Sequence, residues 1–310
     1  MMQPDIVAIG ECLVEFVQLP DGTYRQSYAG DTLNTLFYAS RLGQKTGYVS
    51  AFGSDPFTMG AIDLLDRETI DRRLVANDDG FNGVYYVLDA AGTKRYHFLR
   101  RHSAATRALE HLDGTRLRNY IRDASVLHVS LTAIGIQSYR DGVIKLLEKV
   151  TGDVKITLDS NYRAPVWGSP EIAREYYERA LPYVSMLFVT DTDHRAMYGD
   201  DDLISVIKRY QSFGVDRLAY RMGEKGSVLF DGKAQTIKAM EGLSVVDTTG
   251  AGDAYNAGFI HSMLSGRTFA ECGTFATACA AVAIEEEGGM AKGFSKEKVE
   301  QKLKEAKVSE

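Results

Sequence analysis

The central and C-terminal parts of the chain alternate between short apolar runs and longer segments in which apolar residues recur with helical spacing. Runs of four or five apolar residues are typical of buried strands, whereas apolar positions three and four apart indicate amphipathic helices. Strands are predicted at residues 126–130, 154–158, 186–189 and 217–221, a hairpin at 227–237, and helices at 138–150, 170–181, 203–213, 254–264, 269–284 and from about 295. This order predicts an α/β fold with a doubly wound, mostly parallel sheet and helices on both faces.

The first hundred residues interrupt this order with short alternating segments. Strands are predicted at 6–10, 13–17, 24–28, 83–88 and 93–100, with turns at 20–22 and 89–92. The last four of these strands lie in two insertions, at about 12–29 and 81–102, and are predicted to form one small β-sheet. We expect this sheet to act as a lid on a single domain that spans residues 1–310.

Two helices are predicted between these insertions from their start and stop signals. One runs from about Asp31 to Leu42 and stops at Gly43. The other opens at Asp55-Pro56, with Asp55 as the N-cap and proline at the first helical position.

Composition narrows the class of protein. The formal net charge of −6 argues against a general nucleic-acid or membrane-surface binder. Cys12, Cys272 and Cys279 form no close pair and sit among apolar residues, so they are expected to be buried packing residues in a reducing compartment. No targeting segment and no apolar run of about 18 residues is present, which predicts a cytoplasmic protein.

A glycine-rich stretch, Asp247-Thr248-Thr249-Gly250-Ala251-Gly252-Asp253, lies between the strand-like run Val245-Val246 and a predicted helix. Gly250 and Gly252 allow a tight turn whose N–H groups converge on an anion at the helix N-terminus. Asp253 falls in the first helical turn, where we expect it to be ionised at neutral pH and able to accept a hydroxyl proton as a weak base. The alternative is an ordinary strand-to-helix turn with Asp253 as a helix-start residue.

Polar residues also gather at the start of the first long helix and after a core strand. Gly30 permits close approach of a ligand, and Asp31 and Asn34 lie one helical turn apart, where both can present polar groups to sugar hydroxyls. Asn161 and Arg163 follow the strand at 154–158, and Arg163 can bind a carboxylate or phosphate through two hydrogen bonds. The alternatives are a capped helix start and a surface arginine.

A second glycine-containing stretch follows the strand at 217–221. Arg221, Gly223, Gly226 and Ser227 allow close backbone approach and positive charge near a nucleotide phosphate, although a hairpin turn also needs glycine. The stretch matches neither the Walker A pattern nor the protein-kinase glycine loop. The first strand ends at Gly10-Glu11-Cys12 without the dinucleotide-binding fingerprint, which argues against an oxidoreductase.

With these motifs collected, the chain resembles the PfkB (ribokinase-like) carbohydrate kinase family. The resemblance rests on residues 247–253, on Gly30 to Asn34 followed by Arg41-Leu42-Gly43, and, toward the 2-keto-3-deoxygluconate kinases within the family, on Gly-Asp-Thr-Leu-Asn-Thr at 30–35 and Asn161-Tyr162-Arg163. It implies Asp253 as catalytic base and the Gly250, Ala251 and Gly252 turn as the anion hole. It further implies substrate contacts from Gly30, Asp31, Asn34, Tyr85, Arg100 and Arg163, and nucleotide contacts from Asn161, Arg221, Gly223, Gly226, Ser227, Gly250 and Gly252.

The resemblance also implies ATP and Mg²⁺, with room for a monovalent cation, and a homo-oligomer formed through the lid sheets. Three positions depart from the family pattern. Thr192-Asp193-His194-Arg195 stands where an Asn-x-x-Glu motif is associated with magnesium, so no metal ligand is assigned. Arg221 stands where lysine is common, and Phe98 stands where the ketodeoxygluconate enzymes often have a tyrosine.

The residues and the resemblance together predict an ATP-dependent kinase that phosphorylates the primary hydroxyl of 2-keto-3-deoxygluconate or a close sugar acid. Arg100 and Arg163 favour an acidic substrate, because a neutral sugar does not need two guanidinium groups. Two alternatives stay open: a fructokinase- or ribokinase-type enzyme for a neutral sugar, and a catalytically silent sugar or nucleotide sensor.

Overall fold

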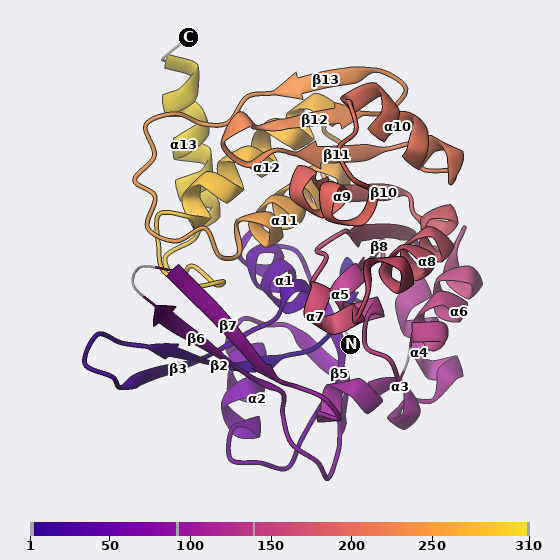
Figure 1. The fold of residues 1–310 in the computed structure, drawn as a ribbon, viewed down its shortest axis with the longest axis vertical. Coiled ribbons are helices and arrows are strands. Elements are labelled where there is room, and N and C mark those ends of the chain that lie inside the picture. Colours follow the sequence, from indigo (N-terminus) through magenta and orange to yellow (C-terminus); the bar gives the residue numbers. More distant parts are fainter. Residues whose placement is uncertain (1–2, 91–92, 139, 309–310) are drawn as a thin grey trace.

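The computed structural model describes residues 3–90, 93–138 and 140–308, and its main feature is a sheet of nine strands (Figure 1). In spatial order these are β13 (Ala234–Ile237), β12 (Ser227–Phe230), β11 (Leu218–Arg221), β10 (Met186–Thr190), β9 (Lys155–Asp159), β8 (Val126–Ser130), β1 (Ile6–Ile9), β4 (Thr46–Phe52) and β5 (Asp71–Asn77). Neighbours pair in parallel from β11 to β5, and β12 and β13 add an antiparallel edge. The predicted doubly wound fold is confirmed.

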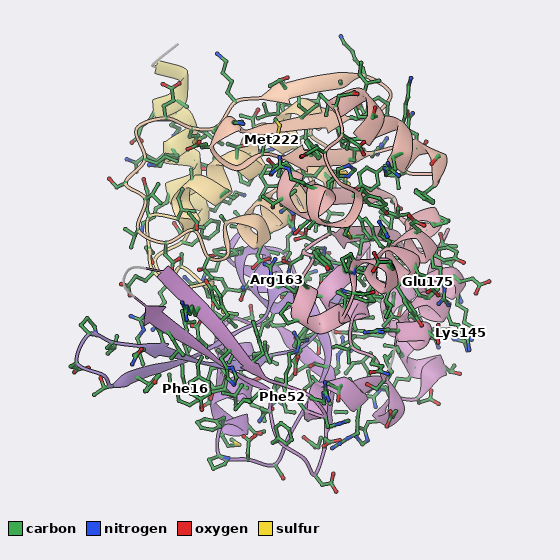
Figure 2. All side chains as sticks on the ribbon, viewed as in Figure 1. Phe16, Phe52, Lys145, Arg163, Glu175 and Met222 are labelled. Carbon is green, nitrogen blue, oxygen red and sulfur yellow. The ribbon has the colours of Figure 1, made fainter. Side chains whose placement is uncertain are left out.

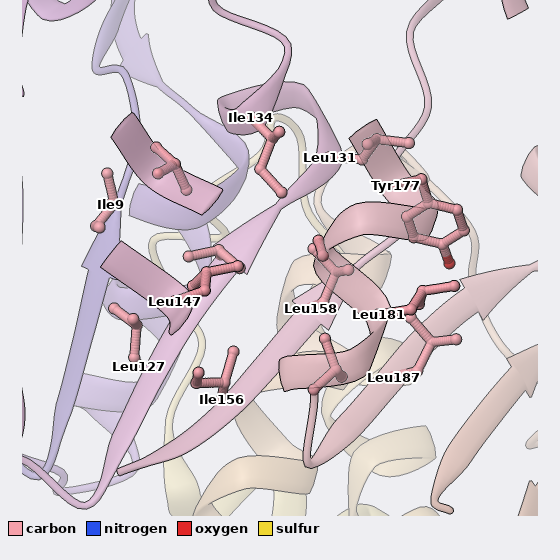
Figure 3. Close-up of a cluster of buried hydrophobic side chains, with 14 of the residues drawn as sticks. Ile9, Leu127, Leu131, Ile134, Leu147, Ile156, Leu158, Tyr177, Leu181 and Leu187 are labelled. Carbon is pink, nitrogen blue, oxygen red and sulfur yellow. The ribbon is translucent and has the colours of Figure 1, made fainter. Parts of the chain in front are cut away.

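Alternate residues of the central strands supply two separate hydrophobic cores, one on each face of the sheet. In β1, Val7 and Ile9 belong to one core, and Ile6 and Ala8 belong to the other. Successive side chains of a strand point to opposite faces, so an unbroken apolar run is the pattern of a strand covered on both sides. The first core, shown in Figure 3, includes Leu127, Ile156 and Leu187 from three neighbouring strands.

Each face is covered by its own set of helices. The first core is closed by α4 (Gly114–Arg122), α6 (Arg140–Val150), α8 (Pro170–Ala180), α9 (Asp191–Tyr198) and α10 (Leu203–Ser212). The second is closed by α1 (Asp31–Arg41), α2 (Thr58–Arg67), α11 (Ala251–Leu264), α12 (Phe269–Ala283) and α13 (Lys296–Val308). α11 packs against both α1 and α12 and is buried on most of its surface from Ala254 to Ser262, so the helix that carries the glycine-rich motif is held rigidly.

The two insertions form one small sheet, as predicted. Its order is β3 (Tyr24–Ala29), β2 (Leu13–Gln18), β6 (Val84–Ala90) and β7 (Thr93–Leu99), with a parallel β2–β6 pair joining the two antiparallel hairpins. Figure 1 shows this sheet projecting from one side of the main body. Of the turn predicted at 89–92, residues 91 and 92 lie outside the described residues.

Several local predictions were wrong or incomplete. The helix after Asp55 begins at Thr58, because the Asp55 carboxylate accepts hydrogen bonds from the N–H groups of Phe57 and Asn82 and so closes a loop instead of a helix. Val245 and Val246 form no strand and are more than half exposed. The strands β4 and β5 were not predicted from the sequence. Neither were six short helices: η1 (Ala104–Arg107), α3 (Ala108–His111), α5 (Leu131–Ile134), α7 (Ala164–Trp167), η2 (Leu181–Tyr183) and η3 (Gly223–Lys225).

Candidate active site

One cavity of about 1570 Å³ lies between the lid and the carboxyl ends of the central strands. Its wall includes Glu11 after β1, Asp159 at the end of β9 and Arg221 at the end of β11, faced by Tyr85 and Phe98 from the lid. Ligands of doubly wound sheets bind at this end of the strands. Most predicted site residues therefore meet in one place although they are spread over more than two hundred positions of sequence.

The glycine-rich turn presents open backbone donors to this cavity. Gly250 is the N-cap of α11 and has a φ of 80°, and a Cβ there would lie 2.3 Å from the carbonyl oxygen of Gly289. Among the described residues, no protein group accepts a hydrogen bond from the N–H groups of Gly250, Gly252 and Asp253. Open donors at a helix N-terminus attract an anion. Gly250 and Gly252 line the cavity, whereas Ala251 does not.

The side chain of Asp247 holds this turn in place through hydrogen bonds. Its Oδ1 accepts hydrogen bonds from the N–H and hydroxyl of Thr249, and its Oδ2 accepts the N–H of Gly288 at 3.1 Å. Asp247 thus joins the turn to the 285–293 loop that follows α12. The motif contained this residue, but its structural role could not be seen without the fold.

Asp253 lies in the first turn of α11 and lines the cavity, as predicted. Its pKa, however, is raised well above the usual range, first by burial, then by the negative charge of Asp31, with a further contribution from Asp159. The sequence-based expectation of a weak, readily ionised base rested on the helix dipole alone and was wrong in direction. Burial and nearby carboxylates outweigh the dipole, and a base with a raised pKa is the stronger proton acceptor.

The predicted sugar-side residues form a hydrogen-bonded cluster with this base. Asn34 donates a hydrogen bond of 2.8 Å to Oδ2 of Asp253, and Asn161 donates one of 2.7 Å to Oδ2 of Asp31. Gly30 adjoins them, and a Cβ there would lie 2.1 Å from the carbonyl oxygen of Glu11. Asn161, predicted as a nucleotide contact, therefore lies in the cavity beside Asp31.

Of the four residues in the 221–227 stretch that were predicted to contact the nucleotide, only one lines this cavity. Arg221 lines the cavity, but Gly223, Gly226 and Ser227 do not. The Ser227 hydroxyl is buried and lies 3.0 Å from the Tyr255 hydroxyl. Gly226 has a φ of 85° in the turn between β11 and β12, so the hairpin alone accounts for this glycine.

The arginines at the cavity fall into two groups. Arg100 forms an ion pair of 2.6 Å with the buried Glu11, and Arg221 forms one of 2.5 Å with the buried Asp159. Neither arginine is the free cation that sequence analysis expected. Arg163 has no carboxylate partner within the described part of the chain, and neither has Arg101, which sequence analysis did not single out as a site residue.

Figure 2 shows Arg163 near the middle of the molecule, whereas Lys145 and Glu175 lie at its rim. The main chain of Tyr162 accepts a hydrogen bond of 3.0 Å from Arg163 Nη1, which leaves the rest of the guanidinium available. A guanidinium without a carboxylate partner at the edge of a cavity can bind an anionic group of a ligand.

The lid contributes aromatic surface and an internal hydrogen bond. Tyr85 lines the cavity, its hydroxyl donates to Glu15, and its ring stacks on Phe98 with centroids 5.3 Å apart. The Tyr85 hydroxyl is thus already engaged within the lid. Phe98 offers the cavity no hydroxyl, in line with the departure noted from the sequence.

The described residues contain no group of three or more His, Cys, Asp or Glu side chains that could hold a metal ion. Asp193 borders the cavity and accepts a hydrogen bond of 2.7 Å from the Ser160 hydroxyl, but it belongs to no such group among the described residues. The three cysteines are free and buried, as predicted. No helix in the described ranges has the length and hydrophobicity needed to cross a membrane.

Residues 3–296 match the family described as pfkB family carbohydrate kinase. The chain belongs to this family and is a sugar kinase. A 2-dehydro-3-deoxygluconokinase from Haemophilus influenzae is 30% identical over 298 residues, which cover 92% of this chain and 95% of that protein. A fructokinase from Klebsiella pneumoniae is 27% identical over 273 residues and 84% of each chain.

Solved structures show the same fold. A putative ribokinase II from Escherichia coli, in complex with ATP and Mg²⁺, has a TM-score of 0.84 at 19% identity and covers 97% of this chain and 99% of its own. A 2-dehydro-3-deoxygluconokinase from Thermotoga maritima has a TM-score of 0.83 at 17% identity and covers 98% and 99%.

Proposed function

We propose that this sugar kinase uses ATP to phosphorylate the primary hydroxyl of 2-keto-3-deoxygluconate or a close sugar acid. The observation that carries the proposal is the position of Asp253, a cavity carboxylate within one helical turn of the open N–H groups of Gly250 and Gly252. A base beside an anion-binding turn meets the needs of phosphoryl transfer to a hydroxyl.

The choice of a sugar acid is supported by the charge of the cavity and by the named activity of several relatives. Arg163 and Arg101 border the cavity without a carboxylate partner among the described residues. A guanidinium binds a carboxylate through two parallel hydrogen bonds, a contact that a neutral sugar does not offer. Relatives at 28–30% identity are 2-dehydro-3-deoxygluconokinases, which act on the same compound under its other name.

Asp253 would accept the proton of the acceptor hydroxyl, and Asn34 would hold its carboxylate in position. The N–H groups of Gly250, Gly252 and Asp253 fit the negative charge of a phosphoryl group in transfer. ATP, when bound, supplies that group, and Mg²⁺ offsets its charge. The scarcity of clustered carboxylates among the described residues fits an ion held mainly by phosphate oxygens and water.

A coupled assay of ADP release with a panel of sugars and sugar acids tests the proposal. We expect turnover with 2-keto-3-deoxygluconate and little with fructose or ribose. Asp253→Asn should leave ligand binding nearly intact and reduce kcat by about a thousandfold or more, since it removes the proton acceptor. Asp216→Asn, an exposed position at the far end of β11, is the matched control. Near-normal turnover of Asp253→Asn would overturn the assignment of the base.

A kinase for a neutral sugar is the second candidate, because fructokinases are also among the relatives. Arg163→Ala separates the two. A loss of activity confined to acidic substrates supports the sugar acid. Wild-type activity on fructose equal to that on the sugar acid would contradict it. Absence of turnover on every acceptor in excess Mg²⁺ would instead indicate a silent sensor.

A further inference from the structure

The buried arginine at the end of β11 joins three elements beneath the glycine-rich turn. Arg221 Nη2 lies 2.5 Å from Oδ1 of Asp159, and Nη1 donates to Oδ1 of Asn256 at 3.0 Å and to the carbonyl oxygen of Gly252 at 3.1 Å. Asn256 closes the ring by donating to Oδ2 of Asp159 at 2.7 Å. The side chains of Arg221 and Asp159 are 9% and 4% exposed, so these bonds form in a water-poor environment.

The bond to Gly252 acts on the anion-binding donors. The carbonyl of Gly252 and the N–H of Asp253 belong to one planar, trans peptide unit and point in opposite directions. A donor that fixes the carbonyl on the inner side therefore fixes the Asp253 N–H on the side of the open helix end. Glycine at 252 leaves room for this contact, because a Cβ there would lie 3.0 Å from Nη1 of Arg221.

The same arginine offsets a charge that acts on the base. Asp159 is one of the carboxylates that raise the pKa of Asp253, and Arg221 neutralises it directly. The other charged or titratable groups around Asp253 are Asp31 and Tyr38 on α1, Tyr85 on β6 and Arg163 before α7, of which Arg163 lowers the pKa.

We propose that Arg221 is a positioning residue for phosphoryl transfer: through Gly252 it orients the Asp253 N–H, and through Asp159 it limits the negative charge around the base. The inference rests on the proposed function of Asp253. Only an arginine offers enough donors in a fixed plane to bond a carboxylate, an amide oxygen and a peptide carbonyl together. Asp159 compensates the charge of Arg221 inside the protein, so the role proposed for Arg221 acts through Gly252 and Asp159.

The test compares wild type with Arg221→Lys, Arg221→Met and the double variant Arg221→Met/Asp159→Asn. The double variant leaves no uncompensated buried charge, so it is the form expected to fold even where Arg221→Met does not. Arg217→Met, an exposed arginine at the other end of β11, is the control. Thermal unfolding of each variant checks that the fold is retained.

Two readouts separate positioning from a general structural role. The double variant should lose about a hundredfold in kcat with little change in the KM of the sugar acid, because a small misplacement of a donor has this effect. In calorimetry it should bind ADP as wild type does, but bind ADP with aluminium fluoride and 2-keto-3-deoxygluconate, a mimic of the transferring phosphoryl, far more weakly. A double variant with wild-type kcat and wild-type binding of this mimic would overturn the proposal.

The pH profile tests the charge effect by itself. In Arg221→Met the acid limb of kcat/KM should move to higher pH, since an unpaired Asp159 raises the pKa of Asp253 further. Arg221→Lys and the double variant should return this limb to near its wild-type position, and Arg221→Lys should still lose about tenfold in kcat for want of the Gly252 bond. An unmoved limb in Arg221→Met would refute the charge effect. Failure of the proposed function is distinct, because it would appear as near-normal turnover of Asp253→Asn, or as a wild type without turnover on the sugar acid, whatever the Arg221 variants show.

Discussion

Asn34 donates a hydrogen bond of 2.8 Å to the carboxylate of Asp253 across 219 positions of sequence. The other end of the same amide, Oδ1, accepts the N–H of Gly30 at 3.2 Å, which fixes the amide with its donor toward the carboxylate. A hydrogen bond to the ionised form lowers the pKa of Asp253, against the raising effects of burial and of Asp31. Helix α1 thereby helps to set the protonation state of a base on α11.

Asn34→Ala should therefore change the pH dependence of the reaction as well as its rate. With the donor removed, the pKa of Asp253 rises further, and the base is protonated over a wider range of pH. The acid limb of kcat/KM should move upward, with a loss of about tenfold for each pH unit below the new pKa and recovery toward high pH.

Steady-state kinetics between pH 5.5 and about 9.5 would measure this shift, a range set by the usual pKa scale of carboxyl and hydroxyl groups. Asn119→Ala, on the exposed face of α4, is the control. A loss of equal size at every pH would mean that Asn34 acts on the substrate alone and leaves the protonation of Asp253 unaffected.

Removal of the base should stabilise the protein at neutral and alkaline pH. The folded-state pKa of Asp253 is raised, so the native protein binds this proton more tightly than the unfolded chain does. Its ionisation lowers stability as pH rises from the unfolded pKa toward the folded one, whereas below the unfolded pKa the effect vanishes. Asp253→Asn should thus raise Tm by a few degrees near pH 8 and leave it unchanged near pH 4.

Thermal unfolding of wild type and Asp253→Asn at several pH values would check this dependence. Asp216→Asn provides the exposed control, with no expected trend. A Tm gain that persists unchanged to acid pH would show that packing, and not the ionisation of Asp253, is responsible. The combination of higher stability with lost turnover is the usual signature of a strained functional group.

Much of the fold could be predicted because its signals are local. Unbroken apolar runs such as Ile6–Ile9 identify strands covered on both faces, and the glycines at 250 and 252 identify a turn before a helix. Val245 and Val246 gave the same apolar signal without forming a strand. Their main chain instead bonds the C-terminal end of α12, where the N–H groups of Val246 and Asp247 donate to the carbonyl oxygen of Ile284.

The electrostatics of the site could not be predicted, because they depend on partners that are distant in sequence. Arg100 and Arg221 are of the residue type that binds anionic ligands. In the fold, however, Glu11 after β1 neutralises Arg100, and Asp159 at the end of β9 neutralises Arg221. Asp253 carried the signal of an ionised helix-start residue, but burial in the folded protein, together with the approach of Asp31, raises its pKa instead. Glu11 lies two residues after β1, and Asn256 lies three residues after Asp253 in α11; neither position is a signal strong enough to select a site residue.

The ion pair of Glu11 with Arg100 should limit the affinity for a sugar acid. Glu11 is 3% exposed and occupies the guanidinium that would otherwise face a ligand carboxylate. Glu11→Gln removes a negative charge from the cavity wall and frees Arg100, so the KM for 2-keto-3-deoxygluconate should fall by about threefold or more. The KM for fructose should not change.

The matched control is Glu15→Gln, a buried lid carboxylate that accepts hydrogen bonds from the hydroxyls of Ser27 and Tyr85. Steady-state kinetics with both sugars gives the comparison. If Glu11→Gln raised the KM for the acid, Glu11 would instead be the residue that holds Arg100 in its productive position.

Trp167 should report the binding of an acidic ligand at Arg163. It is the single tryptophan of the chain, 3% exposed, and ends helix α7, whose N-cap is Arg163. Pro165 and Val166, between these two residues, line the cavity. The Arg140 guanidinium lies 4.6 Å from the centroid of the Trp167 indole. Binding of a carboxylate by Arg163 should shift this four-residue helix and so alter the contact between Trp167 and Arg140.

Titration with 2-keto-3-deoxygluconate should then give a saturable change in tryptophan emission, whereas fructose should give none. In Arg163→Ala the change should disappear, and the affinity for the acid measured by calorimetry should fall by about tenfold or more, as expected for loss of a charge-assisted pair. Arg179→Ala is the control, because Arg179 packs over the neighbouring Tyr176 but lies on the exposed side of α8. Wild-type affinity of Arg163→Ala for the acid would show that the carboxylate is bound elsewhere in the cavity, with Arg101, which has no carboxylate partner among the described residues, as the next candidate.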